Sequence, residues 1–118
     1  MVPVQIPLSS QRTTWTTDDV RSRVEKSKVV VFAKGDDGSP RCGFTERVLN
    51  AIKQSGRPFE VINVYEDRSV IPALKAYSGE HHLPLVYIDG ELVSNSDTQE
   101  RMLDSGELQA ILDAAFEQ

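Results

Sequence analysis

Cys42 is the residue of this chain with the clearest capacity for chemistry. It lies between a loop that contains Pro40 and a predicted helix that begins at Gly43. The N–H groups at a helix start and the positive end of the helix dipole favour an anion, so they lower the pKa of a thiol placed there. Nearby basic residues add to this effect and acidic residues oppose it: Lys34, Arg41 and Arg47 against Asp36 and Asp37. The position predicts a reactive or metal-ligating cysteine rather than a small buried hydrophobic one.

The presence of a single thiol limits what this chemistry can be. The residue three positions after Cys42 is Thr45 and not a second cysteine, so a dithiol exchange cycle cannot close within the chain. Redox chemistry would need an external thiol, and a metal would need ligands from outside the chain. The Thr45 hydroxyl would either donate a hydrogen bond to the thiolate or cap the helix. One cysteine also excludes an internal disulfide and favours a reducing cytoplasm.

The pattern of hydrophobic residues predicts the elements that hold Cys42 in place. Strands are expected at 28–33, 59–64, 85–88 and 91–93, the last two joined by a tight turn at Asp89-Gly90. Helices are expected at about 16–26 and 43–56, around 71–77, from Asp97 with Glu100 in a capping box, and at 108–116, whereas 34–40 is expected to be a loop. The expected fold class is α/β, with a central mixed sheet of about four strands flanked by helices.

Length, composition and charge narrow the class of molecule. With 118 residues, 39% of them hydrophobic and 26% charged, the chain is expected to form one domain, 16–118, after an extended arm, 1–15, anchored by Trp15. No apolar run approaches the roughly 20 residues of a membrane helix, and a secretory signal is not expected. The net charge of −5 arises entirely from the segment 97–118. Because a nucleic-acid binder needs an excess of Lys and Arg, neither nucleic acid nor membrane is an expected partner.

Motifs along most of the chain resemble those of the monothiol glutaredoxins. Lys34-Gly35 precedes Pro40-Arg41-Cys42-Gly43-Phe44-Thr45, which is similar to the Lys-Gly loop and the Cys-Gly-Phe-Ser signature of that family. Further similar segments follow in the same order and spacing, at 75–78, Pro84, 87–93 and 105–108, so the resemblance spans about 17–116. It implies a thioredoxin-like fold in which Pro84 is in the cis form, beside Cys42.

The resemblance also implies a ligand site. In this family glutathione lies across a cleft, and two protomers can bridge a [2Fe-2S] cluster through one cysteine and one glutathione thiol each. Carried onto this chain, Cys42 would be nucleophile and cluster ligand, and Lys34 would hold the glycyl carboxylate of glutathione or stabilise the thiolate. The backbone of Leu83 would pair with the tripeptide, and Ser96 and Asp97 would bind its γ-glutamyl end. Glutathione, iron–sulfur client or carrier proteins and a cluster-bridged homodimer are the implied partners.

Several positions depart from the family pattern. Ile71 stands where many members place a basic residue that grips glutathione, and Ser94-Asn95 replaces a Gly-Gly pair at which the backbone approaches the ligand. The pair His81-His82 is either a solvated loop pair or brings one histidine to Cys42 as base or ligand. Three functions follow as hypotheses: cluster binding or transfer with glutathione, a glutathione-dependent monothiol transferase, and a thioredoxin-fold binding module that has lost both ligands.

Overall fold

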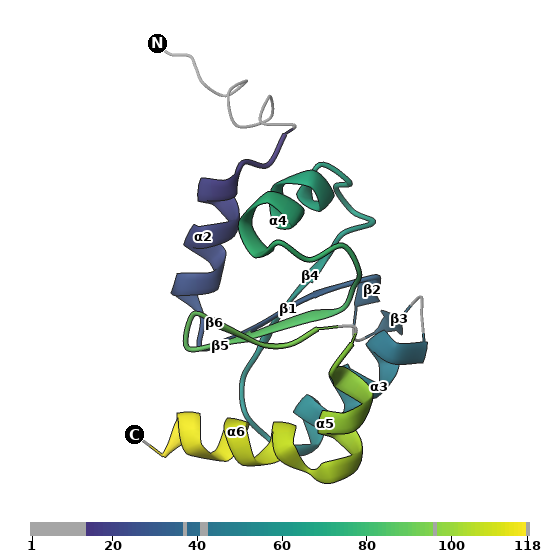
Figure 1. Ribbon diagram of the computed structural model, residues 1–118, viewed down its shortest axis with the longest axis vertical. Helices are drawn as coiled ribbons and strands as arrows, with labels where there is room; N and C mark the ends of the chain where they lie inside the picture. Colours follow the sequence, from purple (N-terminus) through teal and green to yellow (C-terminus); the bar gives the residue numbers. More distant parts are fainter. Residues whose placement is uncertain (1–13, 37, 41–42, 96, 118) are drawn as a thin grey trace.

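Four strands form one mixed sheet in the computed structural model, which describes residues 14–36, 38–40, 43–95 and 97–117. The strands are β1 (Val29–Ala33), β4 (Glu60–Asn63), β5 (Leu85–Ile88) and β6 (Glu91–Ser94), in the spatial order β4-β1-β5-β6 (Figure 1). β1 pairs parallel with β4 and antiparallel with β5, and β5 pairs antiparallel with β6. The expected α/β class and its four-stranded mixed sheet are confirmed.

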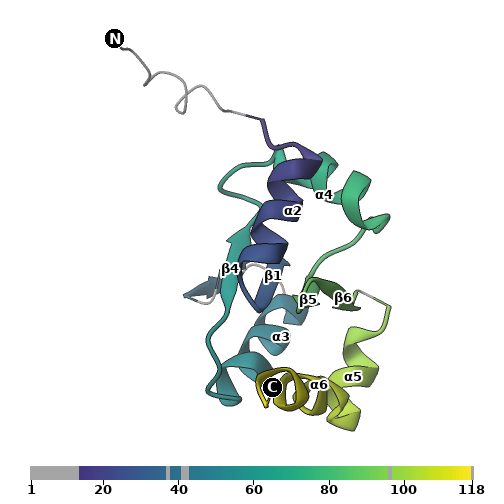
Figure 2. The ribbon, with the colours of Figure 1, turned by 90° about the vertical axis from the view of Figure 1, so that its left-hand side faces the viewer.

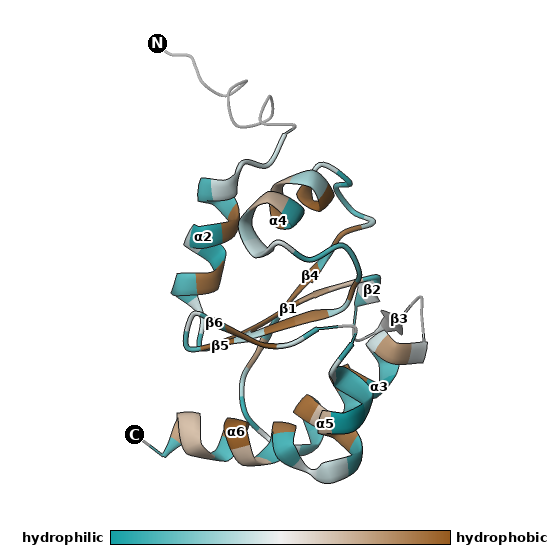
Figure 3. Ribbon diagram, in the orientation of Figure 1, coloured by the Kyte–Doolittle hydropathy of each residue, from teal (hydrophilic) through white to brown (hydrophobic). Residues whose placement is uncertain are grey.

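Helices cover both faces of this sheet. α2 (Thr17–Lys26) and α4 (Val70–Ser78) lie on one face, and α3 (Gly43–Gln54), α5 (Gln99–Ser105) and α6 (Glu107–Phe116) lie on the other (Figures 1 and 2). Since β1 is central and covered on both sides, all five of its residues are buried, as its β-branched run predicts. In Figure 3 the largely brown strands lie between the helices, of which α2 and α5 are teal over much of their length.

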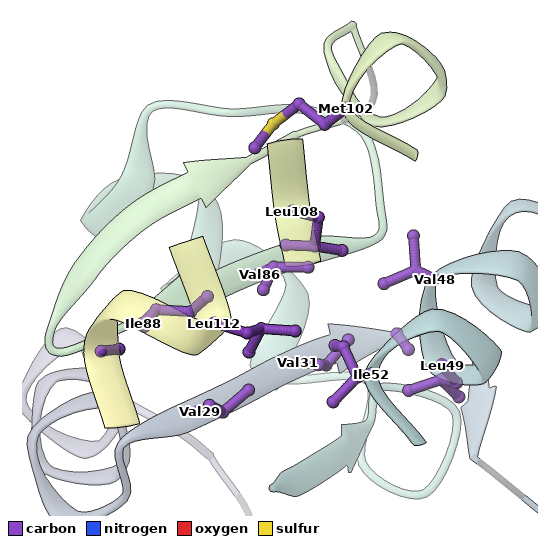
Figure 4. Packing of buried hydrophobic residues seen from close by; sticks show 12 residues of the cluster. Val29, Val31, Val48, Leu49, Ile52, Val86, Ile88, Met102, Leu108 and Leu112 are labelled. Atoms are coloured by element: carbon purple, nitrogen blue, oxygen red, sulfur yellow. The ribbon is translucent and has the colours of Figure 1, made fainter. Parts of the chain in front are cut away.

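The two faces of the sheet belong to two hydrophobic clusters. Successive side chains of β1 point to opposite faces, so Val29 and Val31 join one cluster while Val30 and Phe32 join the other. Figure 4 shows the first cluster, in which α3, α5 and α6 meet the sheet through Val48, Leu49, Ile52, Met102, Leu108 and Leu112. This packing fixes the helix α3 that follows Cys42 against the sheet.

Local signals for a helix start and a turn are confirmed in detail. At the start of α2, the Asp19 N–H donates to Thr16 Oγ1 at 3.2 Å and the Thr16 N–H donates to the Asp19 carboxylate at 2.8 Å. Between β5 and β6, Asp89 and Gly90 have φ of 53° and 82°. Positive φ at both positions is the requirement of a type I′ hairpin turn, which an Asp-Gly pair meets readily.

The prediction that 34–40 is a plain loop is wrong. The segment contains two short strands, β2 (Gly35–Asp36) and β3 (Ser39–Pro40), which pair antiparallel. Two hydrogen bonds explain the hairpin: the Gly38 N–H donates to Asp36 Oδ1 at 3.1 Å, and the Gly35 N–H donates to Asn63 Oδ1 at 3.1 Å. The second bond joins the hairpin to the end of β4, a contact that local sequence cannot reveal.

None of the helices within the described ranges is long and apolar enough to cross a membrane. The longest, α3, has 12 residues, against the roughly 20 that a bilayer requires.

Candidate functional site

Three of the predicted site residues, Lys34, Leu83 and Asp97, lie at one edge of the sheet. Because β1 and β6 both run antiparallel to β5, the carboxyl ends of β1 and β6 and the amino end of β5 share this edge. Lys34 follows β1, Leu83 lies just ahead of β5, and Asp97 follows β6. Gly35 is paired with Pro40, so the hairpin returns the chain to this edge before α3 begins. Three positions that are far apart in sequence are thus brought to the end of the molecule where α3 starts.

Cys42 and Ser96, the remaining predicted site residues, lie outside the described residues. The chain around Cys42 is defined on both sides, since β3 ends at Pro40 and α3 begins at Gly43 directly after the cysteine. Phe44 is 45% exposed and is the one exposed large hydrophobic residue of the described segments, whereas Thr45 is fully buried. The first turn of α3 therefore presents an aromatic ring to solvent and turns the hydroxyl of Thr45 inward.

Lys34 supplies a positive charge at this edge. It occupies the bend between β1 and β2 and is half-buried. Across the part of the chain that the structure describes, no carboxylate forms an ion pair with it, whereas Lys28 is paired with Asp89 at 3.1 Å. A half-buried ammonium without a paired carboxylate attracts an anion more strongly than a fully solvated one does. Lys34 thus has the charge and the position to meet a ligand carboxylate.

The turn before α5 is organised by the side chain of Asn95. Its Oδ1 accepts hydrogen bonds from the N–H groups of Asp97 at 3.0 Å and Thr98 at 3.1 Å. The expected capping box of Asp97 with Glu100 is wrong, because α5 begins at Gln99 after Thr98 and has no side-chain cap. Asn commonly bonds the backbone two residues further on, so Asn95 itself carried the signal. The Asp97 N–H, on the segment implied to bind glutathione, already has an acceptor within the chain.

The Leu83-Pro84 peptide bond is cis, as expected. Leu83 and Ile71 of α4 both line a small pocket between α4 and the loop that leads to β5, together with Leu74, Lys75, Glu80, His81, His82 and Leu85. Ile71, which departs from the family pattern, and Leu83 therefore line the same pocket, and both present aliphatic surface. A charged ligand group gains no partner from either side chain.

His81 and His82 are both exposed and both line this pocket. The chain bends at His82 and Leu83, so it is not an extended segment, in which neighbouring side chains would point to opposite sides. Within the described ranges, no group of three or more His, Cys, Asp and Glu side chains is arranged to hold a metal ion. A role of either histidine as base or ligand for Cys42 stays a prediction.

Tyr87 of β5 is buried in the second hydrophobic cluster, which also contains Leu74 and Leu85 of the pocket lining. Burial raises the pKa of its hydroxyl to about 12, and neighbouring Tyr77 adds to the shift while a hydrogen bond with Ser78 opposes it. The rings of Phe32 and Tyr77 lie 6.0 and 5.9 Å from that of Tyr87. The contacts among these three rings pack α4 against the sheet, and α4 forms one wall of the pocket.

A family model described as Glutaredoxin matches residues 29–93, which is more than half of the chain. The chain belongs to the glutaredoxin family. A protein of Synechocystis named an uncharacterized monothiol glutaredoxin is 38% identical to it over 93 residues, 79% of this chain and 87% of that protein. The resemblance to monothiol glutaredoxins is thereby confirmed, with Cys-Gly-Phe-Thr in the place of Cys-Gly-Phe-Ser.

Solved glutaredoxin structures have the same fold as this one. The reduced apo form of poplar GrxS14 is 35% identical, with a TM-score of 0.71 over 86% of this chain and 93% of that one. The holo form of glutaredoxin C1 from Populus tremula x tremuloides is 25% identical, with a TM-score of 0.70 over 84% of this chain and 96% of that one. The glutaredoxin thus has a thioredoxin-like fold. Several plant and animal relatives are longer, and the chain covers 19–31% of their length.

Proposed function

We propose that this monothiol glutaredoxin works with glutathione through Cys42, and that it binds or transfers a [2Fe-2S] cluster. The observation that carries the proposal is the meeting of Lys34, the cis Leu83-Pro84 peptide and Asp97 at the sheet edge where α3 begins, directly after Cys42. A cation, a loop backbone and the turn after β6 surround the start of that helix. This arrangement suits a short anionic peptide thiol.

The donor set fits a cluster that is shared between chains. Thiolates are the ligands that iron–sulfur clusters prefer, and a [2Fe-2S] cluster takes four of them. The chain holds one cysteine, so two chains would supply two Cys42 thiolates and two glutathione molecules the other two. Lys34 would meet the glycyl carboxylate, the Leu83 backbone would pair with the tripeptide, and Ser96 and Asp97 would receive its γ-glutamyl end. Client or carrier proteins for the cluster follow as partners.

The same site supports a glutathione-dependent transferase. The Cys42 thiolate would attack a glutathionylated thiol, displace the partner's thiolate and form a mixed disulfide with glutathione. A second glutathione would then attack that disulfide, release glutathione disulfide and restore the Cys42 thiol. One cysteine is sufficient for this cycle.

A binding module without glutathione is favoured by two specific observations. The Asn95 side chain already accepts the hydrogen bonds of the Asp97 and Thr98 N–H groups. Ile71 and Leu83 add aliphatic side chains to the pocket and supply no charge there. Both features weaken the hold on an anionic tripeptide. This alternative predicts no calorimetric signal on addition of glutathione.

Anaerobic reconstitution with iron, sulfide and glutathione separates the three functions. We expect a red-brown dimer, seen by visible absorption and solution mass, that requires both glutathione and Cys42. Cys42→Ser should stay colourless and monomeric with an unchanged melting temperature, and Lys34→Met should lower cluster yield through weaker glutathione binding. A colourless wild type that still reduces glutathionylated peptide would support the transferase. A colourless wild type that does not bind glutathione would support the binding module.

We further infer that the protein works in the cytoplasm. A thiol that must stay reduced to act as nucleophile or ligand requires a reducing compartment. Fractionation of cells that express the untagged chain, followed by detection in the soluble and membrane fractions, checks this inference.

A further inference from the structure

Gln99 is a buried polar residue whose side chain has no hydrogen-bond partner among the described residues. Its side chain is 1% exposed, and neither Nε2 nor Oε1 forms a hydrogen bond within the described parts of the chain. An unsatisfied buried amide destabilises a fold, so native proteins rarely keep one unless a water molecule, a ligand or a function accounts for it. The contrast is Gln109 of α6, whose Nε2 donates to the carbonyl oxygen of Ala51.

The position of Gln99 in α5 shows which way its side chain points. Residues three apart share one face of a helix, and Met102, three residues on, packs in the first hydrophobic cluster with Val48 and Leu49 of α3. Gln99 therefore faces the layer between α5, α3 and the sheet, one turn nearer to the start of α5. On α3, Thr45 is likewise one turn ahead of Val48 and is fully buried.

The two helices begin at the same end of the molecule. β1 and β6 run in the same direction, so α3 and α5, which follow their carboxyl ends, both return from the same edge of the sheet. Figure 1 shows α3 and α5 side by side on one face of the sheet, and the two helices are in contact. Gln99 and Thr45 are thus buried polar residues at one end of the first hydrophobic cluster, whose own members are apolar. Cys42 directly precedes α3 at this end.

We propose that Gln99 is a positioning residue for the chemistry at Cys42, an inference that rests on the proposed function. An amide both accepts and donates, and the N–H groups in the first turn of a helix lack partners within that helix. From this layer the Gln99 amide would complete the hydrogen bonds of the first turn of α3, with a bound water as the bridge where the amide does not reach directly. A helix start held in this way stabilises the thiolate that precedes it.

The test compares two identical substitutions in one chain, Gln99→Met and Gln109→Met. In the reaction with glutathione disulfide, the Cys42 thiolate attacks one sulfur, the reagent's S–S bond breaks, a Cys42–glutathione disulfide forms and a glutathione thiolate leaves. We expect Gln99→Met to slow this reaction at neutral pH by at least fivefold, and Gln109→Met to stay within twofold of the wild type. Gln99→Leu serves in place of Gln99→Met if the latter does not fold, as judged by thermal unfolding.

The exchange equilibrium separates a positioning role from a structural one. In a buffer of glutathione and its disulfide, a less stabilised thiolate shifts Cys42 toward the mixed disulfide, and we expect a shift of threefold or more for Gln99→Met. Rates and equilibrium within twofold of the wild type would overturn the proposal. Iodoacetamide needs the thiolate but no glutathione site. If iodoacetamide alkylates the wild type but glutathione disulfide does not react with it, the proposed function is contradicted. The alkylation rates of Gln99→Met and Gln109→Met then still test the role of Gln99.

Discussion

At the scale of single residues, Asn95 decides how many N–H groups the turn after β6 can offer to an anion. Its Oδ1 accepts from the N–H groups of Asp97 and Thr98, at 3.0 and 3.1 Å. The resemblance to monothiol glutaredoxins implied that Ser96 and Asp97 bind the γ-glutamyl end of glutathione, with a Gly-Gly pair at the positions of Ser94 and Asn95. In this chain the Asn95 side chain competes with a ligand for the N–H groups of Asp97 and Thr98.

Asn95→Gly is therefore expected to bind glutathione more tightly than the wild type. The substitution releases the Asp97 N–H, whereas the Thr98 N–H keeps the backbone carbonyl oxygen of Asn95 as an acceptor at 3.2 Å. A ligand carboxylate can then accept from the Asp97 N–H, and one such bond contributes about 1 kcal/mol, or roughly fivefold in affinity. Isothermal calorimetry of the reduced protein measures the change. Ser55→Gly, which loses a hydrogen bond from the Arg57 N–H at the far end of α3, should leave the affinity unaltered. Equal or weaker binding by Asn95→Gly would refute this role.

At the scale of elements, the contact of α4 with the sheet depends on aromatic rings. Tyr87 packs between Phe32 of β1 and Tyr77 of α4, with ring centroids 6.0 and 5.9 Å away. Its hydroxyl is buried, and this raises its pKa to about 12 from the ordinary 10.0. Since α4 also carries Ile71, the same packing fixes one wall of the pocket beside Leu83.

The raised pKa of Tyr87 predicts a loss of stability at alkaline pH. The folded state favours the neutral phenol, so the contribution is complete below pH 10 and is lost as the pH rises from 10 to about 12. The expected decrease in unfolding free energy is roughly 2–3 kcal/mol across this range. Urea unfolding at pH 8, 10, 11 and 12 should show a shallower decrease for Tyr87→Phe than for the wild type. Parallel curves for the two proteins would rule the explanation out.

At the scale of the whole molecule, Trp15 joins the first described residues to the domain. Its backbone N–H donates to Ser69 Oγ at 2.9 Å. The centre of its ring lies 5.7 Å from the guanidinium carbon of Arg23, and the residue packs on the second hydrophobic cluster. Arg23 in turn pairs with Glu60 of β4. Trp15 thereby connects α2, the start of α4 and the sheet, which agrees with its expected role as an anchor.

We expect Trp15→Ala to lower the free energy of unfolding by about 1–3 kcal/mol, less than for a fully buried tryptophan because Trp15 is half-buried. Removal of residues 1–13 with Trp15 retained should cost less than about 0.5 kcal/mol. Chemical unfolding of both variants tests the proposed boundary between an arm at 1–15 and a domain at 16–118. If the truncation costs as much as the substitution, the boundary is misplaced.

Much of the fold could be predicted because its signals are local. The strand β1, the Asp89-Gly90 turn and the helix that begins near Thr16 each depend on a few adjacent residues, and all three were expected. The hairpin at 35–40 was missed because it is held by Asn63, 28 residues away. The start of α5 was predicted at Asp97, but the structure begins this helix at Gln99. The reason is that Asn95 organises the preceding turn, since its Oδ1 accepts from the N–H groups of Asp97 and Thr98.

The sequence by itself determined which chemistry to expect at the site, because it has one thiol ahead of a predicted helix and no second cysteine. The resemblance of its motifs to those of the monothiol glutaredoxins added glutathione to that expectation. Only the tertiary structure decided which groups share the site and which are already engaged. Strand pairing brings Lys34, Leu83 and Asp97 to one edge, and helix packing buries the amide of Gln99. Such facts depend on contacts between segments that are distant in the chain, and no local pattern encodes them.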